Sequence, residues 1–306
     1  MKIFVTGSSG LVGHNVIDND EILKHTLLIP RSKELNLMDY DAVSKYIKKN
    51  QPDLIIHCAG KVGGIQANIK DMFGFYTENA VMGINLVRAA KKHGVKKLIN
   101  LSSSCTYPKN YINPLKEEYI LKGELESTNE GYALAKLGIL KICEYVSNED
   151  RSLEFKTLIP CNLYGKYDKF DEQTAHMIPS IIRKIYNAKK QNIPTVEIWG
   201  NGEARREFMY AGDIADCIAF TINNWEKVPI LMNVGLGYDY SVNEYYESIK
   251  KLLGYNGTFT HDLTKPVGMK RKLLDVTRAA RIGWHAKTSL EDGIRQTYEY
   301  FLKDRI

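Results

Sequence analysis

Residues 2–13, with the sequence KIFVTGSSGLVG, decide the fold of this chain. The apolar run at residues 2–6 indicates a buried strand, and Gly7, Gly10 and Gly13 follow at once, before an apolar helical pattern. Glycine here permits a tight turn and lets the backbone approach a pyrophosphate, whose charge lies at the helix N-terminus. The order strand, glycine loop, helix therefore predicts dinucleotide binding. The candidate cofactor-binding residues of the loop are Gly7, Ser9, Gly10, Leu11, Val12 and Gly13.

The pattern continues beyond this unit as strands that alternate with helices. Such alternation is typical of a parallel sheet with helices on both faces. We predict an α/β fold, a Rossmann doubly wound parallel sheet over residues 1–165, with a smaller C-terminal α/β substrate-binding lobe over residues 166–306 and later strands returning to the sheet. Further strands are expected at residues 26–29, 53–57, 97–101 and 153–160, and helices at residues 41–49, 75–93, 132–146 and 289–302.

Composition places the chain among ordinary globular proteins. The 306 residues are 44% hydrophobic and 25% charged, and no apolar run is long enough to span a bilayer. The N-terminus does not resemble a signal peptide, so we expect a cytoplasmic protein without a membrane partner. The net charge of +6 is spread along the chain, which argues against nucleic acid as a partner. The five scattered cysteines predict neither a disulfide framework nor a zinc site, and no metal is expected.

The end of the second predicted strand bears on which nicotinamide cofactor is bound. An NAD site usually carries an acid there for the ribose 2′-hydroxyl, whereas this chain has Arg31. A guanidinium can pair with a 2′-phosphate, so we expect NADPH or NADP; the alternative is that Arg31 only faces water. After the third strand, Ala59, Gly60 and Lys61 are expected beside the nicotinamide ribose and diphosphate.

Three residues have the chemistry of a ketone reductase. Tyr132 and Lys136 are four apart and share one face of a predicted helix, where the ammonium is expected to lower the pKa of the phenol. Ser103 follows the fourth predicted strand and can hold a reacting carbonyl. The alternative is a chance spacing on an amphipathic helix.

Across nearly its whole length the sequence resembles the GDP-L-fucose synthases, which are extended short-chain dehydrogenase/reductases. The resemblance implies NADPH as cofactor, a GDP-sugar substrate and a homodimer. It also implies 3,5-epimerisation of a GDP-4-keto-6-deoxy sugar, followed by reduction at C4. The matching blocks are residues 59–65, 67–68, 103–109, 128–130, 162–165, 176–179, 206–208 and 271–275.

Residue roles follow from the resemblance at the matching positions. Ser103, Tyr132 and Lys136 are the implied reductase triad, and Cys105 and His176 the implied base and acid of epimerisation. Tyr132, Lys136 and His176 are also expected to contact the cofactor. The implied substrate-binding residues are Ser104, Cys105, Asn162, Lys184, Trp199, Arg206 and Arg271.

Several alternatives stay open at this point. The sugar can be a hexose or a heptose, and the enzyme can be a reductase without epimerase activity. A nucleotide-sugar 4-epimerase that retains NAD, a 4,6-dehydratase and a non-catalytic nucleotide-binding regulatory module are the rival functions. Cys105 and Trp199 can also be core residues, and Lys270, Arg271 and Lys272 a solvated charge cluster.

Overall fold

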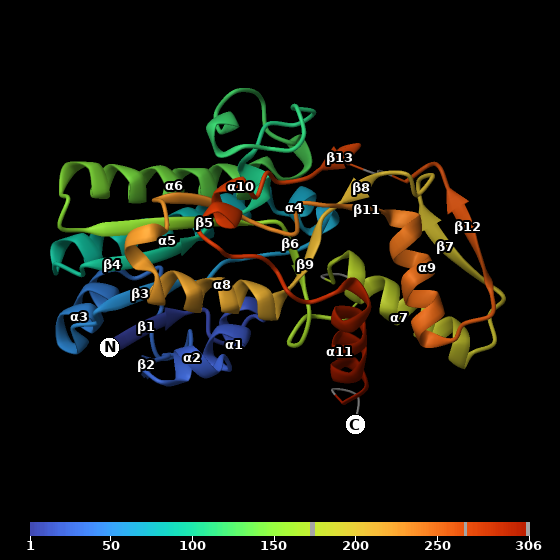
Figure 1. The fold of residues 1–306 in the computed structure, drawn as a ribbon, viewed down its shortest axis with the longest axis horizontal. Helices are drawn as coiled ribbons and strands as arrows, with labels where there is room; N and C mark the ends of the chain where they lie inside the picture. The colour runs from blue at the N-terminus through green and yellow to red at the C-terminus, as the bar shows by residue number, and fades with distance from the viewer. Residues whose placement is uncertain (172–174, 266–267, 304–306) are drawn as a thin grey trace.

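A parallel sheet of six strands, in the order β10-β5-β4-β3-β1-β2, forms the centre of the larger part of the molecule (Figure 1). The computed structural model describes residues 1–171, 175–265 and 268–303. The predicted Rossmann sheet is therefore confirmed. The strands are β1 (Lys2–Thr6), β2 (Thr26–Leu28), β3 (Leu54–His57), β4 (Lys97–Leu101), β5 (Glu154–Pro160) and β10 (Leu231–Val234).

Alternate residues of β1 contribute to two separate cores, one on each face of the sheet. Ile3 and Val5 lie in one core, whereas Phe4 between them lies in the other. The first core is covered by α1 (Leu11–Ile17), α2 (Asp20–Leu23), α8 (Ala211–Asn223) and α10 (Thr277–Arg281). The second is covered by α3 (Tyr40–Asn50), α5 (Met72–Lys92) and α6 (Glu130–Glu149).

The glycine loop between β1 and α1 has the close contacts that its sequence predicts. Gly7 adopts a φ of +69°, and a Cβ there would lie 2.6 Å from Ala59 Cα. A Cβ on Gly13 would lie 2.0 Å from the carbonyl oxygen of Gly7. Both positions therefore exclude a side chain, and α1 begins directly against the ends of β1 and β3.

Apolar residues from the later part of the chain build a third core beside the sheet. Helices α7 (Met177–Lys190), α9 (Val242–Leu253) and α11 (Leu290–Lys303) contribute to it. Although β10 belongs to this half of the sequence, it pairs in parallel with β5 in the central sheet. The small sheets of this region are β7 (Thr195–Trp199) with β12 (Thr258–Asp262), β11 (Tyr240–Ser241) with β8 (Arg205–Arg206) and β13 (Arg271–Lys272), and β6 (Asn162–Tyr164) with β9 (Phe208–Tyr210).

The segment between β4 and α6 projects above the sheet in Figure 1 and reaches the chain near β13. Leu115 N–H donates to the Leu273 carbonyl (2.7 Å), and Asp275 N–H donates to the Leu115 carbonyl (2.9 Å). This short backbone ladder joins an insertion of the sheet to β13 (Arg271–Lys272) and to the basic turn around it, residues 268–275. The segment contains short 3-10 turns at Ser104–Thr106, Glu117–Tyr119 and Ser127–Asn129.

The predicted elements differ from the observed ones mainly at their ends. The helix expected from residue 75 begins at Met72, because the Asp71 side chain caps it by accepting from Gly74 N–H (3.0 Å). A further short helix, α4 (Ile65–Lys70), precedes it. None of the helices in the described ranges combines the length and apolarity that a bilayer crossing requires.

Candidate active site

The side chains of Ser103, Tyr132 and Lys136 meet at the carboxyl end of the central sheet. Ser103 follows β4 and caps the short turn Ser104–Thr106, accepting from Cys105 N–H (3.2 Å). Tyr132 lies in the first turn of α6 and is hydrogen-bonded to the Ser103 side chain. The Lys136 ammonium lies 5.9 Å from the centre of the Tyr132 ring. The structure thus brings together the three residues that the sequence singles out.

Lys136 is held between two strand ends. Its side chain is buried, with 6% of the residue exposed, and Nζ donates to the Leu101 carbonyl at the end of β4 (3.0 Å). A Cβ on Gly60, after β3, would lie 3.5 Å from this Nζ. Burial lowers the pKa of Lys136 to about 8, because an ammonium loses hydration there.

The expected lowering of the Tyr132 pKa is wrong. Burial, and then the neighbouring Cys105, raise the pKa of Tyr132 above its ordinary value, and the hydrogen bond with Ser103 only partly offsets them. Lys136 is not among the groups that shift this pKa, and its ammonium donates to the Leu101 carbonyl. Tyr132 is therefore a protonated phenol at neutral pH.

Cys105 has two nitrogen donors on its sulfur. Asn129 Nδ2 lies 3.2 Å from Sγ, and Lys272 Nζ lies 3.5 Å from it. Lys272 comes from β13 and is only 8% exposed. The sequence predicted neither contact, since it indicated Lys272 only as part of a basic turn.

His176 stands at the N-cap of α7 and faces a buried carboxylate. Its Nδ1 lies 3.6 Å from Asp168 Oδ1, which is too long for a hydrogen bond but close for an ion pair. His176 Nδ1 and Asp168 Oδ2 are both buried without a hydrogen-bond partner among the described residues. Asp168 is thus a site residue that no sequence signal had identified.

The cofactor-binding candidates line the same end of the sheet as the triad. Ala59 N–H donates to the Thr6 hydroxyl (3.2 Å), which holds the loop after β3 against the glycine loop. The Lys61 ammonium lies 2.6 Å from each of the carboxylates of Asp71 and Glu78, so its charge is balanced within the protein. Arg31 is exposed directly after β2. Ser9, Leu11 and Val12 belong to the glycine loop and the first turn of α1, as expected.

Four substrate candidates belong to the third core and the small sheets. Trp199 ends β7 with 41% exposed, and the ammonium of Lys184 lies 5.5 Å from its ring. Asn162 Nδ2 donates to the Glu207 carbonyl (2.9 Å). Arg206 is half-buried on β8, and burial lowers the pKa of its guanidinium. The fifth candidate, Ser104, is buried in the turn after β4.

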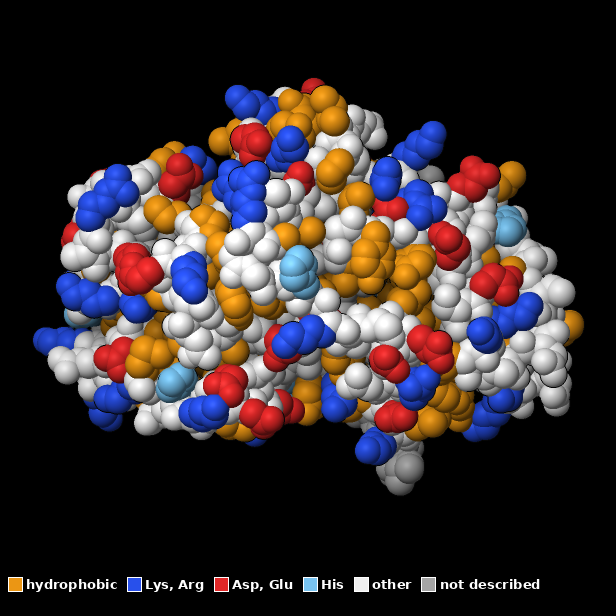
Figure 2. Space-filling view, in the orientation of Figure 1, with side chains coloured by type: hydrophobic (Ala, Val, Ile, Leu, Met, Phe, Trp, Pro, Cys, Tyr) orange, Lys and Arg blue, Asp and Glu red, His pale blue; other side chains and the backbone are white. Residues whose placement is uncertain are grey.

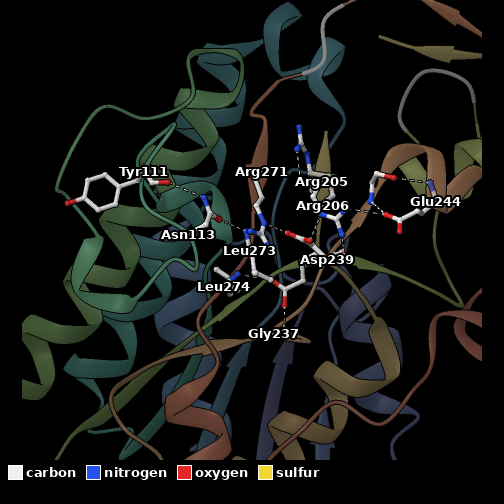
Figure 3. A network of polar contacts seen from close by, with 12 residues as sticks. Tyr111, Asn113, Arg205, Arg206, Gly237, Asp239, Glu244, Arg271, Leu273 and Leu274 are labelled. Atoms are coloured by element: carbon white, nitrogen blue, oxygen red, sulfur yellow. Dashed lines mark hydrogen bonds and ion pairs between the residues drawn. The ribbon is translucent and has the colours of Figure 1, made fainter. Parts of the chain in front are cut away.

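Arg271, the remaining candidate, is bound to a buried acid. The Asp239 carboxylate accepts from Arg271 Nε (2.6 Å) and from Arg205 Nε (2.7 Å), as Figure 3 shows. Lys and Arg side chains also gather over β8 and β13 in the space-filling view (Figure 2). A pocket of about 380 Å³ opens beside this pair, and no residue of the triad lines it. Its lining residues are Asn110, Tyr111, Asn113, Glu203, Arg205, Lys270 and Arg271.

Within the described residues, no group of three His, Cys, Asp or Glu side chains is placed to hold a metal ion. Four of the five cysteines are held as thiols by burial, which raises the pKa of Cys58 and Cys143 to about 12 and those of Cys161 and Cys217 also. Cys105 therefore differs from every other cysteine of the chain in having a lysine and an amide on its sulfur.

Comparison with known proteins identifies the family. Residues 3–235 match the NAD dependent epimerase/dehydratase family. The chain is 54% identical to a GDP-L-colitose synthase of Yersinia pseudotuberculosis, covering 100% of this chain and 99% of the relative. It is 46% identical to a GDP-L-fucose synthase of Azorhizobium caulinodans, covering 98% and 96%.

A solved structure agrees with the sequence relatives. It is a GDP-mannoheptose C4 reductase from Campylobacter jejuni with NADP bound, 31% identical, which superposes with a TM-score of 0.88 and covers 98% of both chains. The Rossmann sheet and the full-length similarity both support the same family, so the resemblance seen in the sequence is confirmed. The chain belongs to the NAD dependent epimerase/dehydratase family, among the GDP-L-fucose synthases and their relatives.

Proposed function

We propose that this protein reduces the C4 ketone of a GDP-4-keto-6-deoxy sugar with NADPH, after epimerising the sugar. The observation that carries the proposal is the meeting of Ser103, Tyr132 and Lys136 at the end of the sheet, with Cys105 next to Tyr132. A reductase needs a proton donor for the developing alkoxide, and Tyr132 is protonated at neutral pH because burial raises its pKa.

The reduction assigns one task to each residue of the triad. NADPH supplies the hydride. Ser103 holds the ketone oxygen through its hydroxyl, which already contacts Tyr132. Tyr132 gives its proton to that oxygen. Lys136 lies against Gly60, where its ammonium can hold the nicotinamide ribose.

Epimerisation precedes reduction because the ketone acidifies the neighbouring C–H groups. Cys105 removes the proton from one face of the sugar and His176 returns one to the other face. The two side chains come from different elements, the turn after β4 and the N-terminus of α7. This arrangement suits a base and an acid on opposite sides of one ring.

The residues present fit the cofactor and the nucleotide. Gly7 and Gly13 leave no room for a Cβ, which is the close backbone packing that a pyrophosphate-binding turn requires. Exposed Arg31 offers a guanidinium to the 2′-phosphate of NADP. The Lys61 ammonium is already paired with Asp71 and Glu78, so Lys61 offers the cofactor its backbone groups. The exposed Trp199 ring, with Lys184 and Arg206, binds the GDP moiety.

The active protein is a homodimer in the cytoplasm. A Cβ on Gly131 would lie 2.6 Å from the Met72 carbonyl, so the first turns of α5 and α6 touch. Apolar side chains are exposed around them: Phe73 is 80% exposed and Leu134 43%. Exposed apolar surface of this kind favours contact with a second copy.

The test is to incubate the protein with NADPH and three GDP-4-keto sugars. The first is GDP-4-keto-6-deoxymannose. The second is its 3-deoxy counterpart, which leads to colitose, and the third is the heptose analogue of the first. We expect stoichiometric NADPH oxidation with one of them and a C4 alcohol in the product by NMR. The Tyr132→Phe variant is expected to lose at least about 100-fold in rate, since it lacks the proton donor. NADPH oxidation with none of the three sugars would contradict the proposal.

A second measurement separates the rival activities. In D₂O, epimerisation introduces deuterium at C5, whereas a reductase alone leaves that carbon unlabelled. A 4-epimerase retains NAD and consumes no NADPH, so tightly bound NAD that copurifies with the protein would favour it. A non-catalytic module would bind GDP-sugar with no turnover.

A further inference from the structure

A buried ammonium from the C-terminal half of the chain lies against the candidate epimerisation base. Lys272 Nζ is 3.5 Å from Cys105 Sγ, although 167 positions separate the two residues in the sequence. Asn129 Nδ2 contacts the same sulfur from the segment that precedes α6, at 3.2 Å. Lys272 is 8% exposed, so its charge is largely withdrawn from water.

Among the described residues, no salt bridge involves Lys272, although Arg271 beside it is paired with Asp239. Leaving a buried ammonium without an anion is costly. A thiolate at Cys105 would supply the missing negative charge. The titratable groups near this pair include Tyr132, which burial keeps protonated, the buried thiol Cys161, and Arg206, which is paired in strand register with Lys272 across β8 and β13.

We propose that Lys272 is a positioning residue that holds Cys105 as a thiolate, with Asn129 as the second hydrogen-bond donor. This inference rests on the proposed function, in which Cys105 removes the proton. A thiolate is the form of cysteine that takes up a proton, and a nearby cation favours it. Lys272 therefore prepares the base before the substrate arrives.

The step is balanced in protons and charge. The Cys105 thiolate takes the proton of the C5–H bond, which leaves a thiol and the enolate of the C4 ketone. A protonated His176 then forms the new C–H bond on the other face and becomes neutral. The proton gained by sulfur and the one lost by imidazole are exchanged with solvent, so D₂O labels C5 in each epimerised molecule.

A different role for Lys272 would be to hold the diphosphate of the GDP-sugar. The neutral variant Lys272→Met and the charge-retaining variant Lys272→Arg separate the two. Lys251→Met, an exposed lysine on α9, is the matched control for removing a positive charge from this half of the chain. Thermal unfolding of each variant checks that it is folded, and Lys272→Gln is the replacement if the methionine variant is not.

The first readout needs no substrate. Alkylation of Cys105 by iodoacetamide is followed by mass spectrometry between about pH 5.5 and 9.5, as a measure of the thiolate. The other four cysteines are expected to resist alkylation, because burial raises their pKa values and keeps them as thiols. We expect Lys272→Met to slow alkylation at pH 7 by about tenfold and to shift the midpoint of the profile upward by about one pH unit. Lys272→Arg and Lys251→Met are expected to keep the wild-type profile.

The second readout is deuterium incorporation at C5. It should fall with Lys272→Met in parallel with alkylation and recover at higher pH, whereas reduction of an already epimerised ketone changes little. An unchanged alkylation profile in Lys272→Met, with or without a raised KM for the GDP-sugar, would overturn the inference and leave the proposed function standing. Deuterium incorporation that persists in Cys105→Ala would instead remove Cys105 as the base, and with it the proposed epimerisation mechanism.

Discussion

Lys136 carries its charge in surroundings that oppose it. The folded protein lowers the pKa of this residue from 10.5 to about 8, so at neutral pH the fold bears the cost of a buried ammonium. Between about pH 8 and 10.5 the folded chain has released this proton and the unfolded chain still holds it. Stability therefore rises with pH across that window, and below pH 8 the full cost is present.

We therefore predict that Lys136→Met stabilises the protein at pH 7, by about 3 kcal/mol at most, while it abolishes reduction. The gain should shrink as the pH rises from 8 to 10.5, because the wild type then loses its buried charge. Urea unfolding of both proteins at pH 7 and 9.5 measures it. A loss of stability at pH 7 would show that the hydrogen bond to Leu101 outweighs the desolvation of the charge.

The Asp168 carboxylate is expected to orient His176 for proton return. Its Oδ1 lies 3.6 Å from His176 Nδ1 and accepts from Lys169 N–H (2.9 Å), whereas Oδ2 and His176 Nδ1 have no hydrogen-bond partner among the described residues. Asp168→Asn keeps the shape but removes the negative charge that faces the ring. We predict about tenfold slower deuterium incorporation at C5, with reduction of the epimerised ketone much less affected. Asp150→Asn, at the exposed C-cap of α6, is the control and should change neither rate.

At the scale of elements, Glu207 ties strand ends together. Its buried carboxylate accepts from the N–H groups of Leu236 and Gly237, after β10, and of Leu274, after β13. Burial raises the pKa of this carboxyl to about 7. The contacts leave Glu207 a structural role in the junction between the central sheet and the basic turn.

Glu207→Ala leaves these three N–H groups without their acceptor. We predict a loss of about 2–4 kcal/mol in the free energy of unfolding, since buried unpaired donors are costly. Urea unfolding measures the loss, and Glu247→Ala on the exposed face of α9 should stay within about 0.5 kcal/mol of the wild type. A change as small as that of the control would mean that water replaces the carboxylate.

The elements also show which parts of the site the sequence could predict. The glycine loop and the pair Tyr132 and Lys136 are local patterns, and the structure places both as expected. Arg271 and Lys272 are adjacent and look alike in the sequence, yet strand geometry sends them to opposite sides, one to Asp239 and one to Cys105. Only the fold decides which of two neighbouring cations reaches the sulfur.

For the whole molecule, the parallel sheet followed from alternation along the chain, whereas the contacts between distant segments did not. The Cys105–Lys272 pair joins the turn after β4 to a strand 167 positions later in the sequence. Hydrophobic periodicity predicts elements and not contacts between distant elements, so it could not predict this pair. The prediction of a lowered Tyr132 pKa was wrong for the same reason. The direction of the pKa shift depends on burial, and the spacing of Tyr132 and Lys136 carries no information about burial.

The exposed apolar side chains at the first turns of α5 and α6 lead to a prediction for the assembly. Phe73→Glu would place a charge in the middle of the proposed contact between two copies, so we expect the dimer to dissociate. Sedimentation velocity measures the change, and Lys190→Glu at the end of α7 is the control that should leave the dimer intact. A wild-type protein that sediments as a monomer would refute the homodimer.

The ladder between Leu115 and residues 273 and 275 limits how relatives of this protein can be recombined. A chimaera that takes only the later half of the chain from another homologue would pair a foreign strand with the native insertion, and Cys105 would face an unfamiliar neighbour. Residues 107–123 and 268–275 are therefore best exchanged as one cassette, cut from two separate places in the gene.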